Sequence, residues 1–206
     1  MSIASQWKGL LDRRDVLILD TETTGVGKRS EVLDIALINT CGQVVYSDPV
    51  LPQGRIPGSA SAVHGLTRAR LRAMSAEPWA EHHAAVERCL TGGRVLLAYN
   101  LDFDLRLLDQ TAERHGFGNF HLPTATRLRC LMLDYAGWRG VPHPWRKGEW
   151  KWHRLTEAAG YEGVASVQSH RALDDANLTL AVMRAVAAKG RGVHGWPSRR
   201  RWRLAR

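Results

Sequence analysis

Three short runs of apolar and β-branched residues near the N-terminus place the strongest constraint on the fold of this chain. They cover residues 15–20, 32–40 and 43–50, and glycine-containing turns separate them. Runs of this length and composition predict consecutive β-strands, and the short second turn predicts a hairpin. Further along, helical periodicity is interrupted by one more strand-like run at 94–100. This order predicts an α/β fold in which helices cover a mixed sheet.

The rest of the pattern predicts a single domain with a short appendage at each end. A length of 206 residues suffices for one domain with a substantial core. We expect an N-terminal extension at 1–14, one domain at 15–189 and a basic tail at 190–206. Helices are predicted at 67–74, 78–90, 101–116, 127–136, 152–160 and 171–188.

The formal net charge of +9 is distributed unevenly along the chain. Up to residue 188 there are 22 basic and 20 acidic residues, whereas seven basic residues and no acidic ones follow. The positive excess therefore lies mostly in the tail. Such a tail can bind phosphate groups in a salt-dependent way, or it can serve only as a solubilising end.

The sequence carries no signal for a membrane or for secretion. Its apolar runs all fall short of the roughly 18 residues that a membrane-spanning helix needs. Cys41, Cys89 and Cys130 lie far apart and form no CxxC pair, which is typical of free thiols in a reducing compartment. We therefore expect a cytoplasmic protein without a membrane partner.

The first predicted strand ends in a pair of carboxylates, within the segment LDTETTG at 19–25. Successive side chains of a strand point to opposite faces, so Asp20 and Glu22 share a face and Thr21 points away. Carboxylates placed in this way can reach the same hard cations. A solvated strand end could carry the same residues, so the pair alone does not decide between the two interpretations.

Two further segments combine acidic residues with the start of a predicted helix. Asp102 and Asp104 fall in the first turn of the helix that follows the strand at 94–100. SHRALDDA (169–176) opens the last predicted helix with one histidine and two aspartates. Because the helix dipole favours acidic groups at an N-terminus, each segment alone has an ordinary structural explanation.

Taken together, four segments have a more specific meaning. DTETTG, VHGLT (63–67), NLDFD (100–104) and HRALDDA occur in an order and with gaps that resemble the DEDDh group of DnaQ-like 3′–5′ exonucleases. This family includes polymerase proofreading subunits, RNase T and oligoribonuclease, and the resemblance covers about residues 15–188. It implies an RNase H-like α/β fold, with a mixed five-stranded sheet flanked by helices.

The same resemblance assigns roles to five residues. It implies that His170 is the general base and that the ligands of two Mg²⁺ (or Mn²⁺) ions are Asp20, Glu22, Asp104 and Asp175. Two such ions about 3.5–4 Å apart can activate a water molecule and stabilise the leaving 3′ oxygen of a phosphodiester. The ions prefer oxygen ligands, and a histidine can take the proton of the water near neutral pH. The expected product is a nucleoside 5′-monophosphate released from a 3′ end.

Two of these assignments involve a choice between neighbouring acids. Phe103-Asp104 matches the Phe-Asp pair of the family, so Asp102 is interpreted as a helix-start acid. Within a helix, His170 would share a face with Asp174, but the family's spacing of His, four residues and Asp selects Asp175. The family spacing and the geometry of a helix are compatible if His170 lies on a loop just before the helix and only Asp175 lies within it.

Contacts to the terminal nucleotide are also implied by the resemblance. The candidate substrate-binding residues are Thr23, Gly25, His64 and Asn100. For His64 the alternative is a role in packing its own loop. The family's second motif commonly has a histidine where this chain has Tyr99, so the details of substrate contact are expected to differ.

The segment WRGVPHPWRKGEWKWHRL (138–155) combines four tryptophans with arginine and lysine. Aromatic faces and cations could stack bases and hold a single strand, and the alternative is a loop packed onto the sheet. A KWxxL-like pattern shared with relatives predicts that Trp152 belongs to the core. Trp138, Trp145 and Trp150 are the candidates for nucleic-acid contact.

The leading interpretation is a metal-dependent 3′–5′ exonuclease acting on single-stranded or frayed DNA. The first alternative is an exoribonuclease similar to RNase T or oligoribonuclease, because the metal site contacts only the phosphodiester. The second is an inactive nucleic-acid-binding accessory module, which the intact set of five residues disfavours. The expected partner is nucleic acid, single-stranded DNA before RNA, and a DNA polymerase or another processing enzyme is a candidate protein partner.

Overall fold

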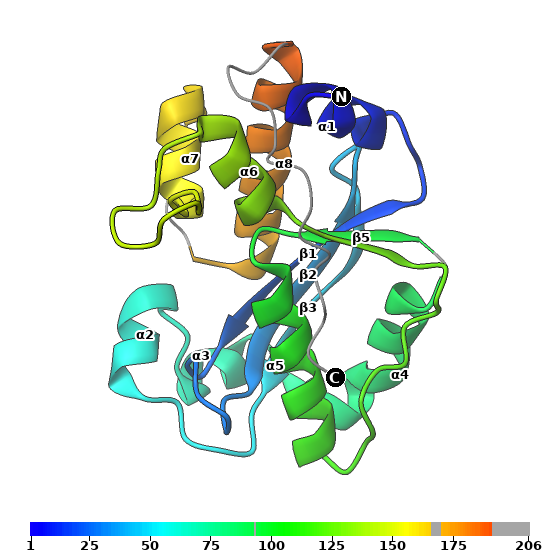
Figure 1. Cartoon of the computed structure of the whole chain (residues 1–206). Helices are drawn as coiled ribbons and strands as arrows, with labels where there is room; N and C mark the ends of the chain where they lie inside the picture. The colour runs from blue at the N-terminus through cyan, green and yellow to red at the C-terminus, as the bar shows by residue number, and fades with distance from the viewer. Residues whose placement is uncertain (93, 166–169, 191–206) are drawn as a thin grey trace.

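The computed structural model describes residues 1–92, 94–165 and 170–190, and these form helices around one mixed sheet (Figure 1). The strand order is β4-β3-β2-β1-β5-β6. β1, β2 and β3 are antiparallel neighbours, whereas β5 runs parallel to β1 and β6 parallel to β5. The strands are β1 (Val16–Thr23), β2 (Val32–Asn39), β3 (Val44–Leu51), β4 (Glu77–Pro78), β5 (Val95–Ala98) and β6 (Arg127–Cys130).

The predicted α/β fold with a mixed sheet is thereby confirmed, with one strand more than expected. The sixth strand, β4, consists of two residues that pair in parallel with the end of β3. The remaining five strands make up the sheet that the family resemblance implied.

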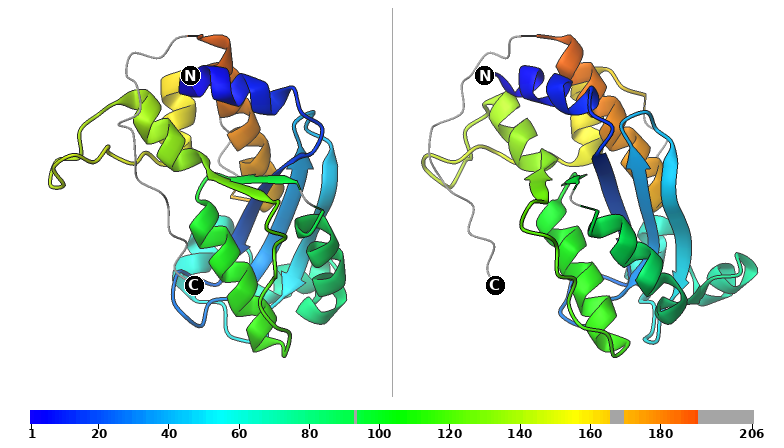
Figure 2. Two further views of the ribbon diagram at one scale, coloured as in Figure 1. Left: turned by 45° about the vertical axis from the view of Figure 1, so that its right-hand side comes forward. Right: turned by 90° about the vertical axis from the view of Figure 1, so that its right-hand side faces the viewer.

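Helices cover both faces of the sheet (Figure 2). β1 is buried between them: Val16 and Ile18 pack with α1, α6, α7 and α8, whereas Leu17 and Leu19 pack with α4 and α5. A strand covered on both faces reads as a continuous apolar run, as this one does. The helices are α1 (Ile3–Leu11), α2 (Gly58–His64), α3 (Arg68–Ala73), α4 (Trp79–Leu90), α5 (Leu101–Arg114), α6 (Leu131–Arg139), α7 (Leu155–Glu162) and α8 (Ala172–Ala188).

Residues 1–14, expected only as an extension, contain a helix that joins the core. Ser2 caps α1 by accepting a hydrogen bond from the backbone N–H of Ser5. Trp7 is fully buried, and its indole nitrogen donates to Asp134 at 2.9 Å. α1 therefore packs against the same face of the sheet as α8.

The helix predicted at 127–136 is wrong over its first four residues, which form β6. Leu128 and Cys130 pack against the core, whereas Arg127 is exposed. This alternation has the period of a strand. Because the run is only four residues long and leads directly into α6, a helical pattern fits it equally well at the sequence level.

The prediction that Trp152 belongs to the core is also wrong. Trp152 is 50% exposed, and the next residue, His153, is buried in its place. The His153 ring lies edge-on to the rings of Tyr135 and Tyr161, and its carbonyl oxygen accepts a hydrogen bond from the Tyr99 hydroxyl at 2.9 Å. The buried position that precedes α7 is therefore residue 153, one residue later than the sequence predicts.

The basic tail predicted at 190–206 lies, from residue 191 onward, outside the described residues. Within the described ranges every helix is too short or too polar to cross a lipid bilayer.

Candidate active site

The site forms where β1 continues beyond its parallel neighbour. β1 pairs with β5 only as far as Leu19 and Ala98, whereas its pairing with β2 continues to Thr23. Asp20 and Glu22 follow Leu19 on the face that α8 covers, because they continue the alternation of Val16 and Ile18. Both carboxylates therefore lie at the open edge of the strand, as the sequence predicts.

Asp104 approaches the same end of β1 from the opposite face of the sheet. It lies in the first turn of α5 and is only 4% exposed. Its carboxylate accepts a hydrogen bond from the Thr21 hydroxyl at 2.7 Å, so the residue between the two β1 acids holds the third. Asp102, interpreted as a helix-start acid, is exposed.

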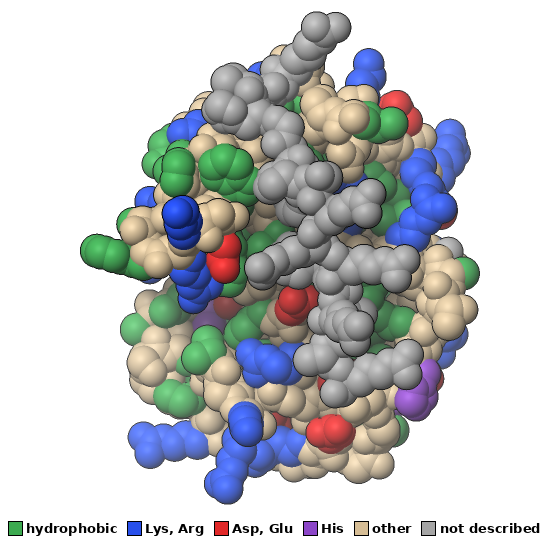
Figure 3. Space-filling model, viewed as in Figure 1, with side chains coloured by type: hydrophobic (Ala, Val, Ile, Leu, Met, Phe, Trp, Pro, Cys, Tyr) green, Lys and Arg blue, Asp and Glu red, His purple; other side chains and the backbone are tan. Residues whose placement is uncertain are grey.

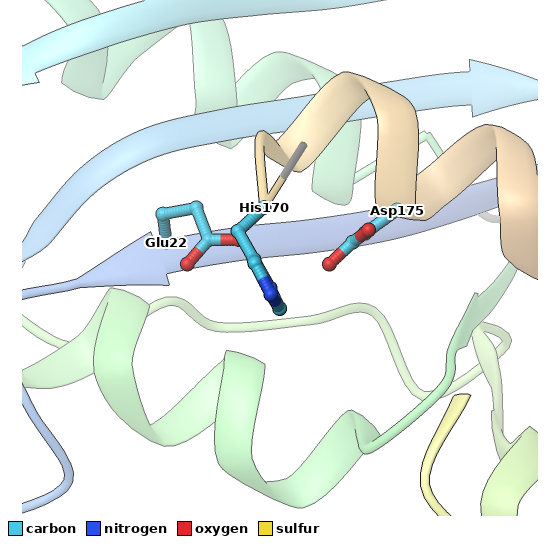
Figure 4. A group of neighbouring side chains, drawn as sticks. All are labelled: Glu22, His170 and Asp175. Carbon is cyan, nitrogen blue, oxygen red and sulfur yellow. The ribbon is translucent and has the colours of Figure 1, made fainter. Parts of the chain in front are cut away.

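His170 and Asp175 complete the group from the start of α8. One ligand atom from each of Glu22, His170 and Asp175 lies within 4.8 Å of the others, and Figure 4 shows the three side chains converging beside β1. α8 begins at Ala172, so His170 precedes the helix and Asp175 lies within its first turn. This geometry places Asp175 in the cluster with His170 and leaves Asp174 at an exposed position.

The backbone of His170 adopts an unusual conformation. Its φ of +44° lies in the left-handed region, which few non-glycine residues adopt. Such a conformation persists only where the surrounding structure imposes it. Here the imidazole lies between the carboxylates of Glu22 and Asp175.

The carboxyl groups of the cluster share an electrostatic environment that favours bound cations. Burial raises the pKa of Asp20 well above its usual range, and Asp104, Asp175 and Glu22 raise it further. Burial, followed by the charges of Asp175 and Asp34, raises the pKa of Glu22 to about 8. Burial also raises the pKa values of Asp104 and Asp175, against the effects of the Thr21 hydrogen bond and of His170 respectively.

Such a group fits hard divalent cations. The carboxylate oxygens are the ligands that Mg²⁺ and Mn²⁺ prefer, and a positive ion removes the mutual repulsion that raises the pKa values. The residues that could hold such ions are Asp20, Glu22, Asp104 and Asp175.

Asp34 is a residue of the site that the sequence analysis missed. It lies on β2 directly opposite Glu22 and is 2% exposed. Its carboxylate accepts hydrogen bonds from Arg171 Nε at 2.6 Å and from the backbone N–H of Ala172 at 3.2 Å. Asp34 therefore fixes the start of α8, and with it the position of His170. The signal in the sequence is an acid within the otherwise apolar run VLDIALI at 32–38.

The candidate substrate-binding residues Thr23 and Gly25 belong to the turn after β1. The Thr23 hydroxyl donates to the Gly25 carbonyl oxygen at 2.8 Å. Gly25 has a φ of +153°, and a Cβ there would lie 3.2 Å from Ser30 Oγ. The turn therefore requires a glycine at this position.

His64 ends α2 as a buried side chain with one unused polar atom. Its Nδ1 accepts a hydrogen bond from the backbone N–H of Leu66 at 3.0 Å, so the Nε2 atom carries the proton of the neutral ring. Nε2 is buried and has no hydrogen-bond partner in the described structure. Burial lowers the pKa of His64, against the opposite effect of the nearby backbone of Thr23.

The two remaining positions of the second motif differ in exposure. Asn100 is exposed at the start of α5, and its side chain makes no capping hydrogen bond. Tyr99 is buried in the core, and its hydroxyl is engaged by the His153 carbonyl. Tyr99 therefore positions the 141–153 segment against the end of β5.

Comparisons with known proteins show the family of the chain. The sequence profile of a family described as exonuclease, RNase_T, matches residues 17–183. A protein of Escherichia phage 186 named uncharacterized exonuclease CP81 is 38% identical over 179 residues, which is 85% of this chain and 90% of the phage protein.

Solved structures of E. coli exonuclease I share the fold. A single-stranded DNA complex of that enzyme with bound zinc gives a TM-score of 0.70 at 19% identity. The alignment covers 85% of this chain and 40% of the exonuclease I chain, so this chain spans less than half the length of that enzyme. A complex with a dT13 oligonucleotide gives a TM-score of 0.69 at 21% identity.

The raised pKa values predict that stability without cations falls as the pH rises. Glu22 and its neighbours bind protons more tightly when the protein is folded, so raising the pH from about 5 to about 8 removes that stabilisation. With Mg²⁺ present the anionic carboxylates are stabilised, and the decline in Tm should disappear. Thermal unfolding in EDTA and in Mg²⁺ measures both profiles.

The combined variant Asp20→Asn, Glu22→Gln is the control for this measurement. It lacks two of the carboxyls with raised pKa values, so its Tm should depend less strongly on pH than that of the native protein and should respond little to Mg²⁺. Identical pH profiles of the native protein with and without Mg²⁺ would contradict a cation site.

Proposed function

Because the chain belongs to the exonuclease family whose profile matches residues 17–183, we propose that it is a metal-dependent 3′–5′ exonuclease. The proposed reaction releases nucleoside 5′-monophosphates from the 3′ ends of single-stranded or frayed DNA. The observation that carries this proposal is the convergence of Glu22, His170 and Asp175 beside the partly buried Asp20 and the buried Asp104. An inactive accessory module would not need to keep this group complete.

Two Mg²⁺ (or Mn²⁺) ions are proposed as the cofactors, held by Asp20, Glu22, Asp104 and Asp175. When bound, they would supply Lewis-acid activation of the attacking water and stabilisation of the leaving 3′ oxygen. The chain's own contribution is to keep the carboxylates in place. Thr21 holds Asp104 by a hydrogen bond, and Asp34 holds the start of the helix that carries Asp175.

His170 is proposed as the general base. It precedes α8 and faces the space between Glu22 and Asp175, where an attacking water would lose its proton. Transfer of that proton to the imidazole creates a positive charge next to two carboxylates, which stabilise it. The left-handed backbone of His170 and the Asp34–Arg171 ion pair support this orientation.

The terminal nucleotide is proposed to lie against the turn after β1 and the end of α2. The buried Nε2 atom of His64 makes no hydrogen bond of normal geometry, although the backbone of Thr23 lies close enough to raise the pKa of the ring, so an acceptor oxygen of the nucleotide could accept a hydrogen bond from it. Thr23 and Gly25 shape the adjoining turn, and Asn100 is exposed at the N-terminus of α5. Single-stranded DNA as the substrate is supported by the exonuclease I complexes, which belong to a protein of the same fold.

The assay for this function compares end-labelled single strands of DNA and RNA. With Mg²⁺ or Mn²⁺ we expect stepwise release of 5′-mononucleotides from DNA with a free 3′ end. No product should form from a blocked 3′ end or in EDTA. Release that persists in EDTA would overturn the proposal, and faster release from RNA would assign the exoribonuclease alternative.

The two neighbouring aspartates of α8 provide a matched pair of variants. Asp175→Ala removes a member of the cluster and should lower kcat by about a thousandfold or more. Asp174→Ala changes an exposed neighbour of the same size and charge and should stay within about threefold of the native kcat. The opposite result would show that the last motif is aligned one residue out of register.

Asp34 is expected to act as a positioning residue. Asp34→Asn keeps the size and an acceptor oxygen but removes the charge that pairs with Arg171, so kcat should fall by roughly 10- to 100-fold with little change in KM. Arg171→Ala should have a similar effect, and Arg171→Lys should restore part of it.

The double variant separates positioning from a general loss of stability. If Asp34 and Arg171 act as one unit, combining Asp34→Asn with Arg171→Ala should cost little more than either change alone. Additive losses in kcat, or losses that follow the decrease in Tm, would remove the positioning role.

A further inference from the structure

Residues 141–152 form a hairpin outside the metal site, which we call the tryptophan hairpin. The backbone N–H of Lys151 donates to the carbonyl of Val141 at 2.8 Å, and that of His143 donates to Glu149 at 2.8 Å. Figure 1 shows this segment, yellow-green between α6 and α7, projecting from the body of the molecule. The projecting arm is therefore an ordered structure with its own hydrogen bonds.

The tip of the hairpin is fixed without being buried. The Nδ1 atom of His143 accepts hydrogen bonds from the backbone N–H groups of Trp145 at 3.2 Å and Arg146 at 3.1 Å. Gly148 supplies the positive φ that closes the turn, at +82°. These contacts hold Trp145 in a defined position although its side chain is 88% exposed.

The structure separates the four tryptophans into two pairs. Trp138 packs against the core and Trp150 is partly buried, so both have a structural role. Trp145 and Trp152 are exposed, and the Arg146 guanidinium lies 5.8 Å from the centroid of the Trp152 ring. Two exposed indoles on a rigid arm indicate a partner that supplies flat surfaces to stack on.

Positive charge is concentrated in the same segment. Residues 138–155 contain five basic residues and one acidic residue, whereas the rest of the chain up to residue 188 has 17 basic and 19 acidic residues. Figure 3 shows basic and hydrophobic side chains projecting together in this region. A partner with flat rings and regularly spaced negative charges matches both properties, which is the chemistry of a single-stranded nucleic acid.

The base of the hairpin is tied to the second motif of the active site. Tyr99 donates its hydroxyl hydrogen bond to the carbonyl of His153, the residue that follows the hairpin. Tyr99 directly precedes Asn100 and the start of α5, which carries Asp104. The base of the hairpin is therefore attached to the segment that leads into the Asp104 helix.

We propose that the tryptophan hairpin holds the single-stranded part of the substrate on the 5′ side of the terminal nucleotide. Trp145 and Trp152 stack on bases, and Arg146, Lys147 and Lys151 contact phosphates. This inference rests on the proposed function, because that function places the 3′ end in the metal site.

The test measures equilibrium binding of a labelled single-stranded DNA of roughly 15 nucleotides by fluorescence anisotropy. The full-length Asp175→Ala chain in EDTA is used so that the strand stays intact. Trp145→Ala should raise Kd roughly tenfold, and Trp145→Phe should keep most of the affinity because a phenyl ring still stacks. Arg146→Ala with Lys147→Ala should reduce the salt dependence of log K by about 1.4 in slope.

The control variant removes the same charge from another surface. Lys8→Ala with Arg88→Ala should leave Kd within about twofold, since both residues are exposed and lie on α1 and α4, outside the hairpin. The Tm of each variant is compared with that of the Asp175→Ala chain, so that a change in Kd caused by unfolding is recognised.

The possible results test the hairpin proposal and the proposed function independently. Unchanged Kd for Trp145→Ala and for Arg146→Ala with Lys147→Ala overturns the hairpin proposal, whatever the hydrolysis assay gives. Binding that depends on the hairpin while no 3′ end is hydrolysed overturns the proposed function and leaves the hairpin intact. Self-association that Trp145→Ala abolishes, without any change in Kd, would assign the exposed indoles to a second copy of this chain.

Discussion

β1 is longer than its parallel neighbour β5, and the cluster of carboxylates occupies the space that this difference leaves. Pairing with β5 stops at Leu19, so the next residues of β1 have a strand on one side only. The first turn of α5 fills the other side and brings Asp104 to Thr21. If β5 continued for three more residues, its backbone would take the place of Asp104, and the acids of β1 would face a paired strand.

Without cations, the crowding of carboxylates at this edge destabilises the folded state. Hydrogen bonds from neighbouring residues keep the carboxylates in place. Burial and mutual repulsion raise the pKa values of Asp20 and Glu22, so both tend toward the protonated form. The hydrogen bonds of Asp104 and Asp34 connect β1, β2, α5 and α8 around them. The site is thus a region where crowded carboxylates reduce local stability, as is common at functional sites.

Sequence patterns predicted those parts of the site that depend on local periodicity and motif spacing. The shared face of Asp20 and Glu22 follows from strand alternation, and the structure places both at the open edge of β1. Asp34 was missed because its partner Arg171 lies 137 residues away, and only tertiary structure brings them together. The choice between Trp152 and His153 as the buried residue depends on how the chain enters α7, which local pattern does not determine.

The short elements β6 and α1 were not predicted, because contacts with residues distant in the sequence determine them as well. A run of four residues such as β6 is compatible with helical and strand periods alike, and its pairing with β5 decides between them. α1 begins at a serine cap that resembles many loop sequences, and its place in the core comes from the contact of Trp7 with Asp134. In both cases the deciding interaction is distant in sequence.

At position 170 the backbone conformation and the proposed role of the side chain favour different residues. Glycine, the residue that best tolerates a φ of +44°, carries no imidazole. A substitution that relaxes this backbone would therefore remove the group that is proposed to accept the proton. Position 170 therefore combines a backbone conformation that favours glycine with a side chain that glycine lacks.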